Sequence, residues 1–210
     1  MQEYKFLSAL FQSKLFYTIL TILCLTVAIL PFIPEIQYQI RKKMEVPYEE
    51  EDIFLDEGEE RSIKIKQEYE SGRLKGNVLV IPTIGVYIDI VEGNSEKILS
   101  KGAWRRPNTS TPDRGGNTVI TAHRYYYIPP NNKTFYNLDK LEIGSKVFIY
   151  WQEKEYIYEV YETLIVKPQQ LEIEENTEDN ILTLYTCHPL FTANKRYVVK
   201  SFLTETKRYL

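Results

Sequence analysis

Two cysteines and two histidines are the residues of this 210-residue chain best suited to nucleophilic and acid–base chemistry. Cys187 ends the run Thr183-Leu184-Tyr185-Thr186, whereas Cys24 lies inside a long uncharged segment. Cys187 therefore has no evident disulfide partner. A cysteine thiolate attacks carbonyl carbon atoms, and a histidine can take the thiol proton and later protonate a leaving amine. The chain thus contains the residue types that nucleophilic catalysis by a cysteine requires.

The choice between the two histidines depends on which strand carries each of them. His188 directly follows Cys187, and neighbours on an extended strand point to opposite faces. His123 ends a different predicted strand, residues 117–123, which a barrel can bring alongside the cysteine. We therefore expect His123, not His188, to face Cys187.

A tetrahedral intermediate also needs a donor for its oxyanion. Arg196 follows the short segment after Cys187, and a hairpin return would place it beside the cysteine. Its guanidinium group stays charged and offers several donors in a rigid fork. Lys195 is the alternative, although strand alternation allows only one of the two residues to face the site.

The remaining chain must supply strands to position these residues. Tyrosine, valine, isoleucine and threonine are abundant, and short runs of β type alternate with turns. Strands are predicted at 78–82, 86–91, 117–123, 146–151, 156–166, 181–186 and 196–203, and short helical stretches at 94–102 and 134–141. An all-β fold with short helices is predicted, in which seven or eight strands form a closed or nearly closed barrel.

Residues 15–34 contain no charged side chain over twenty positions. A membrane-spanning helix needs about 20 apolar residues. An uncleaved anchor after a cytoplasmic tail (residues 1–14) is therefore favoured over a cleaved signal peptide, and the charges that flank the segment do not decide its orientation. Residues 35–77 are predicted to form an extracytoplasmic linker with a strongly acidic stretch at 45–60 and a short helix near 61–71. Residues 78–210 remain for the catalytic domain.

Composition excludes several other classes of protein. The net charge of −3 argues against a nucleic-acid-binding protein. The CxxC and HExxH patterns of metal sites do not occur. Four further arginines, Arg105, Arg106, Arg114 and Arg124, are expected to be solvated surface charges.

Four ordered segments resemble the sortases, which are membrane-anchored cysteine transpeptidases of bacterial cell surfaces. Thr183-Leu184-Tyr185-Thr186-Cys187 is similar to the TLxTC signature of this family. The other three segments are similar to its first strand, its histidine-bearing strand and its arginine-bearing strand, at 79–86, 116–124 and 195–199. The segment after the cysteine, 187–193, is similar to class D and class E sortases.

This resemblance implies an eight-stranded sortase barrel and assigns roles to individual residues. Cys187 would be the nucleophile, His123 the general acid and base, and Arg196 the group that stabilises the oxyanion and the substrate. The implied substrate-binding residues are Thr186, which would shape the pocket, and Thr118 and Val119, which would pack beneath the site.

The implied reaction cleaves an LPxTG-like sorting signal of a surface protein and forms a thioester. An amine of a peptidoglycan precursor or of a pilin then resolves this acyl-enzyme. No cofactor is expected; the alternative is calcium, for which the candidate ligands are Glu172, Glu174, Glu175, Glu178 and Asp179. Two rival functions stay open: a thiol hydrolase that acts on the same peptides, and a non-catalytic, membrane-tethered binding module.

Overall fold

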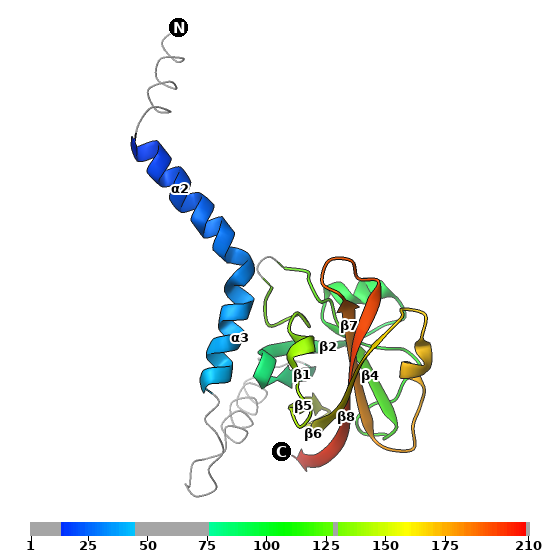
Figure 1. The fold of residues 1–210 in the computed structure, drawn as a ribbon. Helices are drawn as coiled ribbons and strands as arrows, with labels where there is room; N and C mark the ends of the chain where they lie inside the picture. The colour runs from blue at the N-terminus through cyan, green and yellow to red at the C-terminus, as the bar shows by residue number, and fades with distance from the viewer. Residues whose placement is uncertain (1–13, 45–75, 128–129, 209–210) are drawn as a thin grey trace, which may run out of the picture.

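Eight strands close into a barrel in the computed structural model, which describes residues 14–44, 76–127 and 130–208 (Figure 1). The order of neighbouring strands is β1-β2-β3-β4-β7-β8-β6-β5, and β5 pairs with β1 to close the barrel. The strands are β1 (Asn77–Ile81), β2 (Val86–Glu92), β3 (Ala103–Arg105), β4 (Asn117–Thr121), β5 (Lys146–Trp151), β6 (Lys154–Val166), β7 (Ile181–His188) and β8 (Lys195–Arg208). The predicted all-β, eight-stranded barrel is confirmed.

The strand β3 has no counterpart among the predicted strands. It is only three residues long and follows the 3₁₀ helix η3 (Glu96–Ser100). It runs parallel to β2, and the indole Nε1 of Trp104 donates a 2.8 Å hydrogen bond to the carbonyl of Gly93. A segment this short shows no alternating pattern, so tertiary pairing defines it rather than local sequence.

The barrel interior holds the main core, because alternate side chains of each strand point inward. The inward-facing Leu182 and Leu184 of β7 are fully buried there, together with Ile120 of β4 and Val199 of β8. Side chains with the opposite alternation lie on the outer face of the barrel. The catalytic candidates can therefore be assigned to one face or the other by their position along each strand.

A second hydrophobic cluster covers part of this outer face. Val119, Tyr185 and Val198 come from three adjacent strands, β4, β7 and β8. Ile173 packs on them from the 3₁₀ helix η5 (Leu171–Glu174), which lies in the connection between β6 and β7. The β6–β7 connection thus covers part of the outer face of these three strands. The strand ends that carry the candidate residues lie next to this covered area.

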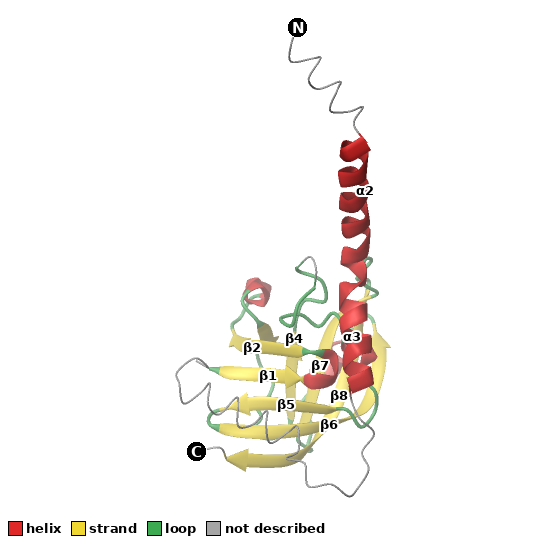
Figure 2. Ribbon diagram, turned by 90° about the vertical axis from the view of Figure 1, so that its left-hand side faces the viewer, coloured by secondary structure: helices red, strands yellow, loops and turns green. Residues whose placement is uncertain are grey.

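The N-terminal part of the chain is helical. It comprises α2 (Lys14–Ile29), the 3₁₀ turn η1 (Leu30–Phe32) and α3 (Ile33–Met44), and α3 lies against the barrel in both views (Figures 1 and 2). Glu35 forms an ion pair with Lys140, whose Nζ lies 4.2 Å from the ring centroid of Tyr38. The segment predicted as a linker from residue 35 therefore begins as a docked helix.

Over the described residues, none of the helices is both long enough and apolar enough to cross a bilayer. The predicted acidic stretch at 45–60 and the predicted helix near 61–71 lie outside the described residues.

Candidate active site

Strand β7 is the centre of the site, because its two neighbours carry the other candidate residues. It runs parallel to β4, with Thr121 paired to Tyr185 at the last position of that ladder. It runs antiparallel to β8, where Cys187 and Arg196 are direct partners. Side chains of directly paired residues project from the same face of a sheet. The fold thus brings the cysteine and the arginine to one face of two adjacent strands.

His123 reaches the same face from β4. It lies two residues beyond Thr121, so continuation of the parallel register sets it opposite Cys187. Both residues are an even number of positions from members of the outer cluster, His123 from Val119 and Cys187 from Tyr185. His123, Cys187 and Arg196 are all half-buried. They share the outer face of the three strands, next to the hydrophobic cluster that Ile173 covers.

Side-chain hydrogen bonds continue the junction of β4 and β7 beyond the last backbone pair. The hydroxyl of Thr121 donates to the carbonyl of Tyr185 at 2.9 Å, and that of Thr186 donates to the carbonyl of Ala122 at 2.8 Å. Both hydroxyl groups are buried, where a satisfied hydrogen bond stabilises and an unsatisfied one is costly. These two bonds hold the residues that directly precede His123 and Cys187 in register.

A third link joins the two residues that follow the candidate pair. Arg124 follows His123, His188 follows Cys187, and Arg124 Nη1 lies 2.8 Å from His188 Nδ1. A guanidinium group can only donate, so Nδ1 accepts and the His188 ring carries its proton on Nε2. Burial, with a further contribution from the positive charge of Arg124, lowers the pKa of His188. His188 therefore serves as a neutral acceptor in this link.

Arg124 was expected to be a solvated surface charge, and that prediction is wrong. Its side chain is only 8 % exposed and forms an ion pair with Asp139 through Nη2. The reason is its position, because the residue after an outward-facing His123 turns toward the inner side of the barrel end. Alternation along β4 was the signal that could have placed this arginine.

Two of the other three arginines are also bound rather than freely solvated. Arg105 pairs with Glu92, and Arg106 pairs with Glu174 at 2.9 Å. The Glu174 carboxylate also accepts a 2.7 Å hydrogen bond from the hydroxyl of Tyr185. This shared carboxylate fastens the β6–β7 connection to the outer face next to the site.

The imidazole ring of His123 packs against an aromatic side chain. It stacks on Tyr126, with 4.9 Å between ring centroids and an interplanar angle of 10°. Burial lowers the pKa of His123 below its ordinary value of 6.5, since the charged imidazolium loses hydration. The ring is therefore neutral at pH 7 and ready to accept a proton.

Arg196 is held by the loop between β7 and β8. Its Nη1 donates to the carbonyl of Ala193 at 3.1 Å and to that of Lys195 at 2.9 Å. These bonds keep the guanidinium group at the loop that borders Cys187. The side chain of Lys195 is exposed, and this residue pairs with His188 instead of Cys187.

The three predicted substrate-binding residues are all buried. Thr186 is 1 % exposed and uses its hydroxyl to tie the two strands together. Val119 is fully buried in the outer cluster beneath the site. Thr118 is also fully buried, but it belongs to the opposite face of β4 from His123, because side chains alternate. Thr118 therefore does not pack beneath this face of the site.

The acidic residues of the β6–β7 connection were the alternative calcium ligands. Glu174 already binds Arg106 and Tyr185. In the described part of the chain, no three His, Cys, Asp or Glu side chains are grouped closely enough to hold a metal ion.

A closed eight-stranded barrel with cysteine, histidine and arginine at the ends of three adjacent strands defines a class of cysteine-dependent proteins. The sortase domain model matches residues 79–204, and the chain belongs to the sortase family. It is 31 % identical over 136 residues to sortase D of Bacillus subtilis, covering 62 % of this chain and 64 % of that protein.

Solved structures agree with this placement. Sortase A of Listeria monocytogenes aligns with a TM-score of 0.58 and 23 % identity over 64 % of this chain and 90 % of that one, which supports the fold. Sortase E1 of Streptomyces coelicolor, solved with a tripeptide in its active site, aligns with a TM-score of 0.57 and 25 % identity, covering 63 % and 90 %.

Proposed function

We propose that this protein is a cysteine transpeptidase that cuts an LPxTG-like sorting signal and transfers the acyl part to an amine. The observation that carries the proposal is the pairing of Cys187 with Arg196 on a face that His123 shares. This chain spans less than two thirds of the length of sortase D of Bacillus subtilis. Its activity, substrates and partners are therefore inferred from the residues of the site.

The first half of the reaction forms a thioester. The Cys187 sulfur attacks the scissile carbonyl carbon, and the proton of its thiol passes to the neutral His123. The Arg196 guanidinium donates to the carbonyl oxygen as negative charge develops on it. His123 then returns the proton to the leaving amine, the C–N bond breaks, and the acyl group stays on sulfur.

The second half resolves the acyl-enzyme. The nitrogen of an incoming amine attacks the thioester carbon, and His123 takes a proton from this nitrogen. The C–N bond forms, the C–S bond breaks, and sulfur leaves as a thiolate that regains the proton from His123. A thioester retains the energy of the acyl group, so an amine that arrives before water completes the transfer.

Mass spectrometry of the full chain mixed with a library of LPxTG-like peptides tests the proposal. We expect a covalent adduct on Cys187 that an added primary amine converts to a new amide. Cys187→Ala should abolish the adduct and all turnover, with an unchanged thermal unfolding transition. A Cys187→Ala variant that retains its biological activity would support a binding module, and exclusive release to water would support a hydrolase.

The proposal includes a single-pass anchor at residues 15–34 that holds the catalytic domain outside the cell membrane. The support is the absence of charge over this segment and the exposed apolar side chains along α2. The acyl donors would be surface proteins, and the acceptor would be a cell-wall or pilin amine. Protease added to intact cells should digest the domain; a protected domain would contradict this location.

A further inference from the structure

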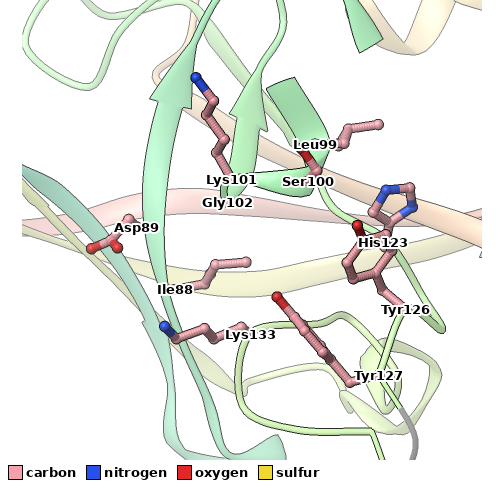
Figure 3. Close-up of a pocket in the computed structure, with 10 residues that line it drawn as sticks. All are labelled: Ile88, Asp89, Leu99, Ser100, Lys101, Gly102, His123, Tyr126, Tyr127 and Lys133. Atoms are coloured by element: carbon pink, nitrogen blue, oxygen red, sulfur yellow. The ribbon is translucent and has the colours of Figure 1, made fainter. Parts of the chain in front are cut away.

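A pocket opens beside His123 on the side away from β7 and β8. It lies between β2, the η3–β3 segment and the loop that follows β4, and Figure 3 shows the residues around it. Neither Cys187 nor any other residue of β7 or β8 lines it. His123 is thus shared between two places: the outer face that carries the cysteine and a separate pocket.

The floor of this pocket is rigid. Ile88 of β2 is 2 % exposed and belongs to the core. Gly102 lies close against the same strand, because an added Cβ there would be 2.4 Å from the carbonyl oxygen of Asp89. The pocket is therefore built on close packing of β2 and β3 rather than on a loose gap between loops.

The two ends of the pocket differ in chemistry. Figure 3 shows His123 and Tyr126 at one end and Asp89 and Lys133 at the other, with Lys101 on the upper rim. The lining residues include two lysines and one aspartate, so their formal net charge is +1. Among the ion pairs of the described part of the chain, none involves Asp89, Lys101 or Lys133.

We propose that this pocket binds the acceptor of the transfer reaction, a primary amine on a short peptide that bears a nearby carboxylate. The inference rests on the proposed function and adds the recognition of the second substrate. The amine end would lie at His123, which must take its proton, and the carboxylate would lie toward Lys101 and Lys133. The acyl chain on Cys187 occupies the outer face, so both substrates reach the histidine without competing for space.

The reaction at this site balances as an aminolysis. The neutral amine attacks the acyl carbon, a C–N bond forms and the C–S bond of the thioester breaks. The proton of the amine passes to His123 and then to the departing sulfur. The positive rim also disfavours the protonated form of the amine, which is the unreactive one.

Two matched amines test this assignment on the full chain. The Cys187 thioester is formed with a sorting-type peptide, and glycylglycine is compared with glycylglycinamide, which lacks the carboxylate. We expect glycylglycine to compete with water at a concentration about fivefold lower than glycylglycinamide needs. This factor is the size of an exposed ion-pair effect. This preference should shrink at high salt, because exposed charges are screened.

The paired substitution Lys101→Gln/Lys133→Gln should reduce the preference to about one. Lys146→Gln, an exposed lysine of β5 outside the pocket, should keep it. An unchanged preference in the double variant, or equal use of both amines by the unaltered chain, would overturn the acceptor pocket while the thioester still forms. Failure to form the thioester at all would instead overturn the proposed function.

Discussion

His123 has two flanks that are built in opposite ways. Toward β7, buried hydrogen bonds of Thr121 and Thr186 and a partly buried one of Arg124 fix its strand to the strand of the cysteine. Toward β2, it borders a pocket whose tyrosines are well exposed, Tyr126 at 51 % and Tyr127 at 37 %. The contrast suits a two-step transfer, because the first step needs one fixed geometry of nucleophile and base. The second step needs an opening through which another molecule can reach the same base.

The largest effect should separate the two histidines. His123→Asn removes the proposed general acid and base, and we expect turnover to fall by about 10²- to 10⁴-fold. His188→Asn keeps an acceptor for Arg124 and should lose less than about tenfold. Steady-state rates with the sorting-type peptide measure both. A larger loss for His188 than for His123 would reverse the assignment made from strand alternation.

The oxyanion donor gives the next largest effect. Arg196→Lys preserves the charge but replaces a rigid fork with a point charge, so turnover should fall about 100-fold, as for loss of one oxyanion donor. The loss should appear in kcat as well as in kcat/KM. Lys195→Gln, one residue earlier and exposed, is the control and should stay within about threefold. Equal losses in both variants would show that general charge near the β7–β8 loop matters rather than Arg196.

Strand alternation predicted much of this face before the structure was known. It separated His123 from His188 and allowed only one of Arg196 and Lys195 to face the site, because side chains alternate between the two faces of a strand. The same rule, extended by one residue, would have turned Arg124 inward. That residue was assigned to the surface on its type alone, although its side chain is only 8 % exposed.

Features that depend on distant contacts were not predictable in this way. The strand β3 has three residues and exists because β2 and β4 pair with it on either side. The pocket beside His123 combines two connections and one strand, which have no shared sequence pattern. The docking of α3 includes an ion pair between residues 35 and 140 and the packing of Tyr38 on the barrel. Periodicity reports which face a residue occupies, but not which loop comes to lie over it.

The flank of His123 toward β7 can be weakened through the partly buried ion pair of Arg124 and Asp139. Arg124→Met leaves Asp139 without its partner and removes the donor to His188, so the free energy of unfolding should fall by about 3 kcal/mol. Asp139→Asn should cost less, because the carboxylate is 29 % exposed and the amide can still accept from Arg124. Urea unfolding of the two single variants and the double variant gives their coupling. Additive losses would mean that the pair does not act as one unit.

The smallest effect concerns the open flank and appears in the pH profile. Burial keeps the pKa of His123 below 6.5, so formation of the acyl-enzyme, which needs neutral His123 but no free amine, should stay fast down to a pH below that value. Tyr126→Ala uncovers the stacked ring, its pKa should rise toward the ordinary value, and the acid limb should move to higher pH.

The lowered pKa of His123 also determines how the stability of the folded protein changes with pH. A histidine with a lowered pKa in the folded protein contributes stability above pH 6.5 that is lost as the pH falls through the folded-state pKa. Tyr126→Ala should therefore make the loss of stability at low pH smaller. Tyr125→Leu is the control, since Tyr125 contacts Tyr136 and Phe191 instead of His123 and should leave the acid limb in place. Equal displacement of the limb in both variants would mean that the β4–β5 loop as a whole, and not the stacked ring, sets the protonation of His123.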